Sequence, residues 1–343
     1  MSNLFSLGLG TGTQNSNGEW LEVFYPAPQL DVDASIIPAL QTIGYSAGNQ
    51  TLEISNAQMQ QLANALAQAG ATELSAIAEK LSTSVQKLVV VALASDEAPQ
   101  TAPEAYLKLH LLSHRLVKPH GTNLAGMFGL LKNVAWTNEG AIDVVELPAR
   151  QLQARLQGRL LEVMSVDKFP KMTNYVVPTG TRIAHTARIR LGAYIGEGTT
   201  VMHEGFVNFN AGTEGTAMIE GRISAGVFVG NGSDLGGGCS TMGTLSGGNN
   251  VIISIGKECL IGANAGVGIP LGDRCTIEAG LYVTGGSVIQ LLDSNGGAVE
   301  KVKARDLAGK SDLLFRRNSV TGAIEALTNK SAIELNEELH AHN

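Results

Sequence analysis

Aliphatic residues recur at every sixth position in the second half of the chain, and this period constrains the fold more than any other feature. A period of six fits neither an α-helix at 3.6 residues per turn nor an alternating strand. It fits a coil with three flat sides, each of which contributes one aliphatic residue to the interior. The repeat comprises Ile183, Ile189, Ile195, Val201 and Val207; Ile223, Val229 and Leu235; Ile255, Ile261 and Val267; and Leu271, Ile277 and Val283.

Glycine supports the same interpretation. The chain has 41 glycines, and 25 of them lie between Gly180 and Gly286. Many directly follow a repeat residue, as in Ile195-Gly196, Val229-Gly230 and Ile261-Gly262. Glycine at a corner permits backbone conformations that a Cβ would resist. We therefore predict a parallel β-helix of about five coils with about 18 residues each. The alternative, an irregular glycine-rich β domain, does not explain a phase that persists over so many steps.

The period is interrupted twice. One break lies between Val207 and Ile223, and the other between Leu235 and Ile255. An insertion in a solenoid forms a loop on one face, and that face is commonly the binding face. We expect two such loops and expect the functional site beside them.

The flanking segments predict two further parts. Residues 1–178 are expected to form an α/β domain, residues 179–290 the β-helix, and residues 291–343 a small capping segment. In the first part, WLEVFYP is typical of a strand, and helices are predicted at Ala57–Ala69, Glu73–Leu81, Pro103–Val117 and Glu146–Leu161. The last part should contain a hairpin around residues 294–297 and a helix over residues 332–342.

Composition excludes several classes of function. The chain is 44% hydrophobic and 16% charged with a net charge of −7, which is typical of a globular protein that does not bind nucleic acid. We expect neither a signal peptide nor a membrane span, because the longest apolar run covers only residues 88–94. Cys239, Cys259 and Cys275 form no CxxC motif and are expected as reduced thiols in a cytoplasmic protein.

Charged residues mark candidate sites within this charge-poor repeat. Glu204, Glu220 and Arg222 lie in or beside the first break in the period. Residues 301–317 carry six basic and two acidic side chains. This basic segment is either an ordinary surface patch or a clamp for the phosphates of a coenzyme.

Longer blocks of sequence resemble one family. They include RIRLGAYIGEGTTVMHEGFVNFNAGTEG, MIEGRISAGVFVGNGSDLGGGCSTMGTLSGG, IGANAGVGIPLGD, EAGLYVT, VKARDL, LLFRRNS and, nearer the N-terminus, EAYLKLHLLSHRLVKPH. These blocks closely resemble the long form of the tetrahydrodipicolinate N-succinyltransferases, and they cover most of the chain.

The resemblance implies a left-handed coil and an activity. The expected reaction transfers succinyl from succinyl-CoA to the amine of ring-opened tetrahydrodipicolinate, in diaminopimelate and lysine biosynthesis. The resemblance also implies a homotrimer with active sites between neighbouring β-helices, and no prosthetic group.

The resemblance assigns roles residue by residue. Glu220 of MIEGR is implied as the catalytic carboxylate, and Glu204 of HEGF as a magnesium ligand near the trimer axis. Relatives carry an aspartate metal ligand where this chain has Ala187. The implied succinyl-CoA site comprises Arg222, Gly237, Ser240, Ala263, Glu278, Ala279, Gly286, Lys303, Arg316, Arg317, Asn318 and Ser319.

The chemistry leaves alternatives open. A thioester is already activated, so the enzyme must hold the reactants together, remove a proton and stabilise an oxyanion. Glu220 could act as a general base or as a nucleophile. The competing functions are another acyltransferase, a non-catalytic scaffold, or a metalloenzyme like the γ-carbonic anhydrases. The last would need several converging histidines, but the repeat contains only His185 and His203.

Overall fold

The computed structural model describes residues 3–244, 251–293 and 295–328, and the chain forms two compact units. The first comprises Met1–Val117, Gly121–Pro170 and Asn174–Val176. The second comprises Lys118–His120, Lys171–Thr173 and Val177–Asn343. The expected three-part division at residues 178 and 290 stays a prediction. Within the described ranges, no helix has the length and apolar character needed to cross a membrane.

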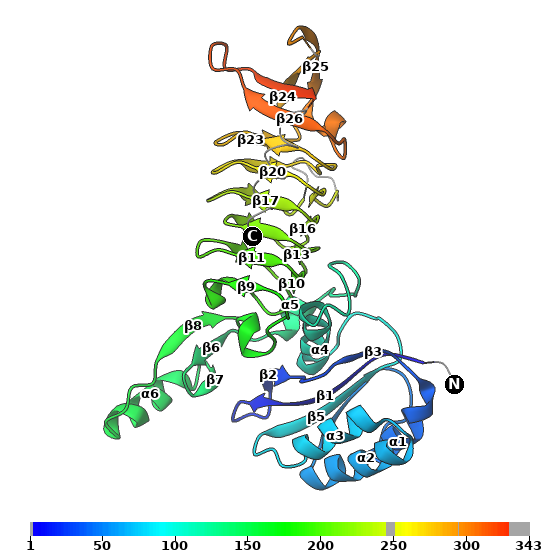
Figure 1. The fold of residues 1–343 in the computed structure, drawn as a ribbon. Coiled ribbons are helices and arrows are strands. Elements are labelled where there is room, and N and C mark those ends of the chain that lie inside the picture. The colour runs from blue at the N-terminus through cyan, green and yellow to red at the C-terminus, as the bar shows by residue number, and fades with distance from the viewer. Residues whose placement is uncertain (1–2, 245–250, 294, 329–343) are drawn as a thin grey trace. The chain divides into compact units, whose positions relative to one another are not determined.

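A five-stranded antiparallel sheet forms the base of the first unit. Its order is β2-β1-β5-β4, with β3 also paired to β1. Helices cover one face of this sheet (Figure 1), and the apolar side chains between the two layers form a hydrophobic core. The strands are β1 (Leu4–Gln14), β2 (Trp20–Phe24), β3 (Gln29–Val32), β4 (Gln50–Ile54) and β5 (Lys87–Leu93). The covering helices are η1 (Ala34–Ile36), α1 (Ile37–Gln41), α2 (Asn56–Gln68) and α3 (Thr72–Leu81).

Helices occur at all four predicted positions. Besides α2 and α3, these are α4 (Ala102–Ser113) and α6 (Leu147–Leu156). Helix α2 begins at a capping box, in which Ser55 accepts the backbone N–H of Gln58 and the Gln58 side chain accepts that of Ser55. Helices α4 and α6 end earlier than predicted, because residues in left-handed conformations follow them, Arg115 at φ 62° and Gly158 at φ 70°.

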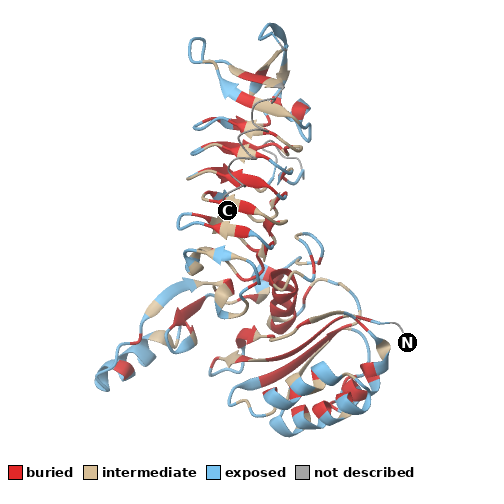
Figure 2. Ribbon diagram, viewed as in Figure 1, coloured by how far each residue is buried: buried red, intermediate tan, exposed pale blue. Residues whose placement is uncertain are grey.

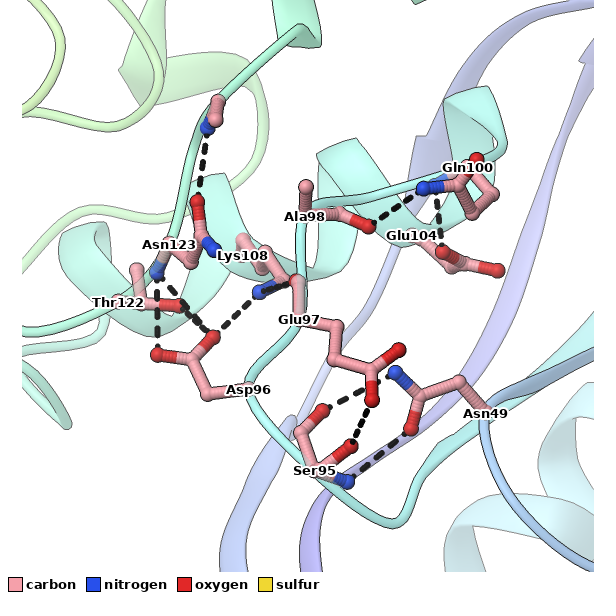
Figure 3. Close-up of polar contacts among 11 residues, drawn as sticks. Asn49, Ser95, Asp96, Glu97, Ala98, Gln100, Glu104, Lys108, Thr122 and Asn123 are labelled. Atoms are coloured by element: carbon pink, nitrogen blue, oxygen red, sulfur yellow. Dashed lines mark hydrogen bonds and ion pairs between the residues drawn. The ribbon is translucent and has the colours of Figure 1, made fainter.

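Helix α4 is buried on every side, although its sequence predicts a single apolar stripe. Figure 2 shows this helix almost entirely in the buried class, and every residue from Pro103 to Ser113 is buried. Buried charge requires a partner. Lys108 is fully buried and forms an ion pair with Asp96, which also accepts hydrogen bonds from the Thr122 hydroxyl at 2.8 Å and the Asn123 amide at 3.0 Å (Figure 3). This network joins α4 to the segments on either side of it.

A second, smaller sheet completes the first unit. Its order is β7-β6-β8, with both pairs antiparallel. A small apolar cluster of Ala135, Ile142, Ala154 and Leu161 joins the sheet to α6. The elements here are α5 (Met127–Leu130), β6 (Val134–Thr137), β7 (Gly140–Asp143) and β8 (Val163–Asp167).

The second unit is the predicted parallel β-helix, whose strands stack as successive rungs (Figure 1). Its three sides are called faces one, two and three below. Face one contains β9 (Arg182–Ile183), β11 (Thr199–Val201), β14 (Ala217–Ile219), β17 (Ser233–Leu235), β20 (Leu260–Ile261), β22 (Thr276–Ile277) and β26 (Leu313–Arg317). Face two contains β12 (Phe206–Val207), β15 (Arg222–Ile223), β18 (Ser240–Thr241), β21 (Gly266–Gly268) and β23 (Tyr282–Thr284). Face three contains β10 (Tyr194–Ile195), β13 (Gly212–Thr213), β16 (Phe228–Val229) and β19 (Ser254–Ile255).

The prediction of an insertion loop between Val207 and Ile223 is wrong. Val207 pairs directly with Ile223, and this coil is shorter than the preceding one, which pairs Val201 with Ile219. The period continues from Val207 through Thr213 and Ile219, and the step to Ile223 is then shorter than a regular side of the coil. The sequence did not reveal this continuation, because Thr213 is not aliphatic. Thr213 is nevertheless buried in the coil, where its hydroxyl oxygen lies 2.7 Å from that of Thr199.

The second predicted insertion is confirmed. Val229 pairs with Ile255, so this coil is longer than its neighbours, and the extra residues leave it after β18. An antiparallel bridge between Thr244 and Ile252 closes the base of this excursion. Its residues 245–250 lie outside the described part of the chain.

The three cysteines are free and buried, as expected. Two of them belong to a ladder of buried donors on face one that satisfies corner carbonyls. Ser233 donates to Gly256 O at 2.7 Å, Cys259 to Gly272 O at 3.2 Å, and Cys275 to Lys310 O at 3.2 Å. These side chains therefore serve the packing of the coil.

Four strands and a short helix close the second unit. The predicted hairpin is confirmed for the described residues, with β24 (Val288–Leu292) antiparallel to β25 (Ala298–Lys303), and Ser294 lies outside the described residues. Helix η4 (Ala304–Leu307) follows, and β26 then rejoins face one by pairing with β22. Strand β27 (Ile324–Thr328) pairs with both β24 and β26. The predicted helix over residues 332–342 lies outside the described residues. Helices η2 (Met172–Asn174) and η3 (Thr186–Arg188) border the first coil.

The close stacking of coils predicts that a single methyl group at Gly230 destabilises the protein. A Cβ at Gly230 would lie 2.6 Å from the backbone of Gly256 in the next coil. Such overpacking typically costs about 1–3 kcal/mol. Gly230→Ala should therefore lower the midpoint of thermal unfolding. Gly129→Ala is the matched control, because nothing lies within 4 Å of a Cβ there. Equal midpoints for the two variants would contradict the stacking argument.

The buried imidazole of His110 predicts loss of stability in acid. Its Nδ1 lies 2.8 Å from Tyr106 O and its Nε2 accepts the Tyr25 amide at 3.2 Å, which is the bonding pattern of a neutral ring. Burial lowers the pKa of His110 from 6.5 to about 3. The unfolded chain thus binds a proton at a higher pH than the folded protein, and stability is lost as pH falls below about 6.5.

We expect His110 to reduce the free energy of unfolding by about 2 kcal/mol between pH 7 and pH 5. Urea denaturation at the two pH values measures this loss. In His110→Gln the loss should be smaller by that amount, whereas the contribution of His114, whose pKa burial also lowers, is common to both proteins. An identical loss of stability in both proteins would show that protonation of His110 does not cause it.

Candidate functional site

One corner of the β-helix collects most of the predicted site residues. The strands of face one end in register, where Ile219, Leu235, Ile261, Ile277 and Phe315 pair in turn. The residue after each strand donates its N–H to the end of the next strand, at 2.8–2.9 Å. This corner is called the Glu220 edge below. Its members in successive coils are Glu220 and Gly221; Gly236 and Gly237; Gly262 and Ala263; Glu278 and Ala279; and Arg316 and Arg317.

Glu220 lies in the shortened corner between β14 and β15. Gly237 borders its carboxylate, because a Cβ at Gly237 would lie 3.4 Å from Glu220 Oε2. The corner is tight, since a Cβ at Gly221 would meet Cys239 Sγ at 2.3 Å. Glycine at these positions keeps space beside the carboxylate and lets the backbones of two coils approach.

Arg222 and Ser240 lie side by side on face two. They are register partners, and the Arg222 guanidinium donates from Nη2 to Ser240 Oγ at 2.8 Å. Glu220 precedes strand β15, so it and Arg222 do not share one strand face although they are two residues apart. Both charges nevertheless act on one group. Burial raises the pKa of the Cys239 thiol to about 12, Arg222 opposes this rise and Glu220 adds to it.

The far end of the Glu220 edge is held by acidic side chains. Glu278 Oε2 accepts the backbone N–H of Arg317 at 2.6 Å. The buried Glu325 accepts the Arg316 Nε at 3.0 Å and the Asn318 side chain at 2.8 Å. These hydrogen bonds, that of Asn318 first, lower the pKa of Glu325. Arg316 therefore has a structural partner within the chain.

Lys303 and Gly286 come together where the coil meets the C-terminal strands. The residue after Lys303, Ala304, donates its N–H to Ser287 O at 2.9 Å. Arg305 Nε donates to Gly285 O at 3.1 Å. Lys303 and Gly286 are both exposed, as is Ser319 in the turn between β26 and β27.

The basic segment 301–317 does not form one cluster. Lys310 precedes strand β26 and Arg316 lies toward its other end, so the two residues belong to opposite edges of face one. Asp312 forms an ion pair with Arg274, which donates from Nε to Asp312 Oδ1 at 2.6 Å and from Nη2 to Oδ2 at 2.9 Å. The hypothesis of a clamp built from the whole segment therefore needs correction: Lys310 does not lie with Lys303, Arg316 and Arg317.

The implied metal ligand lies on the same corner, one coil before Glu220. The Glu204 side chain is 74% exposed and lies 4.0 Å from the His203 ring, which in turn packs edge-on against His185 at 4.9 Å between centroids. Arg188 binds the backbone carbonyls of Glu204 and Gly205, which leaves the Glu204 carboxylate out of that contact. Among the described residues of this single chain, no three His, Cys, Asp or Glu side chains gather as a metal site.

Reasoning from the sequence missed two features of this site. One is the shortened corner at Glu220, which Gly221 could have revealed if Thr213 and Ile219 had been counted in the repeat. The other is Cys239, which lies against that corner; no sequence pattern distinguishes it from the other buried cysteines.

Comparisons with known proteins agree with this architecture. A family profile described as the hexapeptide repeat of succinyl-transferase matches residues 252–285. A second, described as the middle of tetrahydrodipicolinate N-succinyltransferase, matches residues 131–171. A 2,3,4,5-tetrahydropyridine-2,6-dicarboxylate N-succinyltransferase of Pseudomonas putida is 67% identical over 100% of both chains, and that of Vibrio cholerae is 62% identical over 99% of both.

The chain belongs to this family of N-succinyltransferases. It is therefore an enzyme, a transferase. The crystal structure of a Campylobacter jejuni protein described as a 2,3,4,5-tetrahydropyridine-2-carboxylate N-succinyltransferase matches it with a TM-score of 0.89 at 31% identity, over 97% of this chain and 94% of that one. The residues matched by the middle profile of the succinyltransferases include the small sheet of β6, β7 and β8.

Proposed function

We propose that the Glu220 edge and face two bind succinyl-CoA and transfer its succinyl group to the amine of ring-opened tetrahydrodipicolinate, L-2-amino-6-oxopimelate. The products are N-succinyl-2-amino-6-oxopimelate and coenzyme A, in the succinylase branch of diaminopimelate and lysine biosynthesis. The observation that carries the proposal is the sequence of groups along this corner. A carboxylate and a guanidinium, from Glu220 and Arg222, lie at one end, and basic residues lie several coils away.

The reaction requires few catalytic groups from the protein. The amine nitrogen attacks the thioester carbonyl, the carbon–sulfur bond breaks, and the amine proton must leave. Glu220 is the catalytic carboxylate, either as the base that accepts this proton or as a nucleophile that first forms an acyl anhydride. The Cys239 thiol takes no part, because its raised pKa keeps it protonated at neutral pH.

Arg222 supplies the cation that a succinyl donor or a dicarboxylate acceptor needs. A carboxylate buried without a partner would be costly, and a guanidinium can bind one with two hydrogen bonds. Ser240 Oγ already accepts a hydrogen bond from Arg222, so it can orient the guanidinium or donate to the same carboxylate. We assign Arg222 to the carboxylate of the succinyl group.

The coenzyme extends along the coils from this end. Glu220 and Arg316 are separated by four strand spacings, or about 19 Å at about 4.8 Å per strand. Gly237, Ala263 and Ala279 keep most of the intervening edge free of long side chains, and Glu278, which also lies there, accepts the backbone N–H of Arg317. The remaining members of the proposed succinyl-CoA site are Glu278, Gly286, Lys303, Arg316, Arg317, Asn318 and Ser319.

The active assembly is a homotrimer of left-handed coils, in which the cleft beside the Glu220 edge is completed by a neighbouring chain. A three-fold axis next to Glu204 would bring three exposed carboxylates together, and carboxylate oxygens are the ligands that magnesium prefers. Magnesium would there link the subunits, and Ala187 cannot add a ligand. The free, buried cysteines agree with a cytoplasmic location.

The central test is Glu220→Gln, which removes the charge with little change of shape. We expect kcat to fall about 100-fold or more, while binding of coenzyme A in calorimetry persists. Turnover near that of the unchanged enzyme would reassign Glu220 to structure. Mass spectrometry of enzyme quenched with succinyl-CoA separates the two routes, because only the nucleophile forms a succinylated Glu220.

A second test compares two exposed lysines on different parts of the unit. Lys303→Ala should raise the KM for succinyl-CoA about tenfold at low ionic strength, and by less at high salt, because it removes one charge-assisted contact to phosphate. Lys310→Ala, on the opposite edge, should leave this KM unchanged. Equal effects of the two substitutions would show that only net charge matters.

A third test concerns assembly. Light scattering combined with size-exclusion chromatography should give three times the 35.9 kDa mass of the chain for the active species. An active monomer would overturn the proposed trimer.

A further inference from the structure

An aromatic ring lies on face two, in the same column as Arg222 and Ser240. The register along this face runs from Arg222 to Ser240, then to Gly266 and then to Tyr282. Tyr282 leads strand β23 and is 45% exposed, so one side of the residue is open to solvent. An exposed aromatic ring therefore lies in line with the arginine that the proposed function assigns to the succinyl carboxylate.

Gly266 lets this ring lie against the coil. A Cβ at Gly266 would be 2.2 Å from Tyr282 Cδ2 and 2.3 Å from Cγ and Cε2. The ring therefore covers the backbone of the preceding coil and leans toward Ser240. Any side chain at position 266 would push it away.

The position of the ring relates it to the coenzyme. Tyr282 is three strand spacings from Arg222, or about 14 Å at about 4.8 Å per strand. Gly286 and Ser287 follow Tyr282 along the chain. The Ser287 carbonyl accepts the N–H of Ala304, and this hydrogen bond places Lys303 near Gly286. The ring thus lies between the proposed acyl end and the proposed phosphate end of the site. The part of coenzyme A between its thioester and its pyrophosphate is the pantetheine arm, a chain of methylene and amide groups.

We propose that the Tyr282 ring, seated on Gly266, is the apolar wall that binds the pantetheine arm. This inference rests on the proposed function. Aromatic rings bind methylene and amide groups by area burial and stacking, and a ring pinned at its inner face loses little freedom when the arm binds. The wall holds the arm along face two, so that the thioester reaches Glu220 and Arg222.

The test is calorimetric titration of the full-length enzyme with two ligands. One is coenzyme A, and the other is adenosine 3′,5′-bisphosphate, which lacks the arm. Tyr282→Ala should weaken binding of coenzyme A about tenfold and leave binding of the bisphosphate unchanged. Tyr282→Phe, which keeps the ring, should retain the affinity for coenzyme A. Tyr194→Ala is the control on face three, where that ring packs against Phe228 at 5.7 Å.

Gly266→Ala provides a second route to the same result. It should weaken binding of coenzyme A to the extent that Tyr282→Ala does, and it should add no further loss in the double variant, because both substitutions remove the same wall. Equal weakening of both ligands, or no weakening of coenzyme A, would overturn the proposal. Failure of the unchanged enzyme to bind coenzyme A would instead refute the proposed function.

Discussion

The in-register hydrogen bonding of one coil to the next is the constraint on which the β-helix and its site depend. The strands within the coil proper are very short, so no strand is stable alone and every rung relies on its neighbours. Register places Ile219, Leu235, Ile261 and Ile277 in one interior column. The same register places the residues that follow them in one exterior column. Packing of the interior and alignment of the candidate site are therefore one property.

The exceptions to regularity occur where chemistry is proposed. The step through Glu220 and Gly221, from Ile219 to Ile223, is shorter than a regular side of the coil, so Glu220 lies just before the strand that carries Arg222. The corner tolerates this shortening because Gly221 lets Cys239 approach. The excursion after β18 begins beside Ser240, the hydrogen-bond partner of Arg222. Glycines elsewhere in the repeat serve the close approach of coils, as at Gly230.

Some charged side chains of the second unit are paired within the chain, and others are exposed to solvent. Arg316 and Asn318 hold the buried Glu325, and Arg274 holds Asp312, so these groups stabilise the C-terminal strands. Lys303 and Lys310 are exposed, but they belong to different parts of the unit. In the first unit, the ion pair between the buried Lys108 and the partly exposed Asp96 likewise serves structure, because it joins the middle of α4 to the segments on either side of the helix. Counting charges along a segment does not distinguish these roles.

Sequence alone determined the parallel coil, because a period of six is visible without any knowledge of contacts, and the resemblance to the family supplied Glu220, Arg222 and the other residues of the proposed site. Sequence also predicted the four main helices to within a few residues. Only the tertiary structure decided that Thr213 continues the repeat, that no loop follows Val207, and that Lys310 lies apart from Arg316. These facts depend on pairing between residues that lie a whole coil apart, and a threonine or a lysine carries no local mark of its partner in the next coil. The alignment of Tyr282 with Arg222 has the same origin, since three coils of different length separate them in sequence and only their register brings them onto one face.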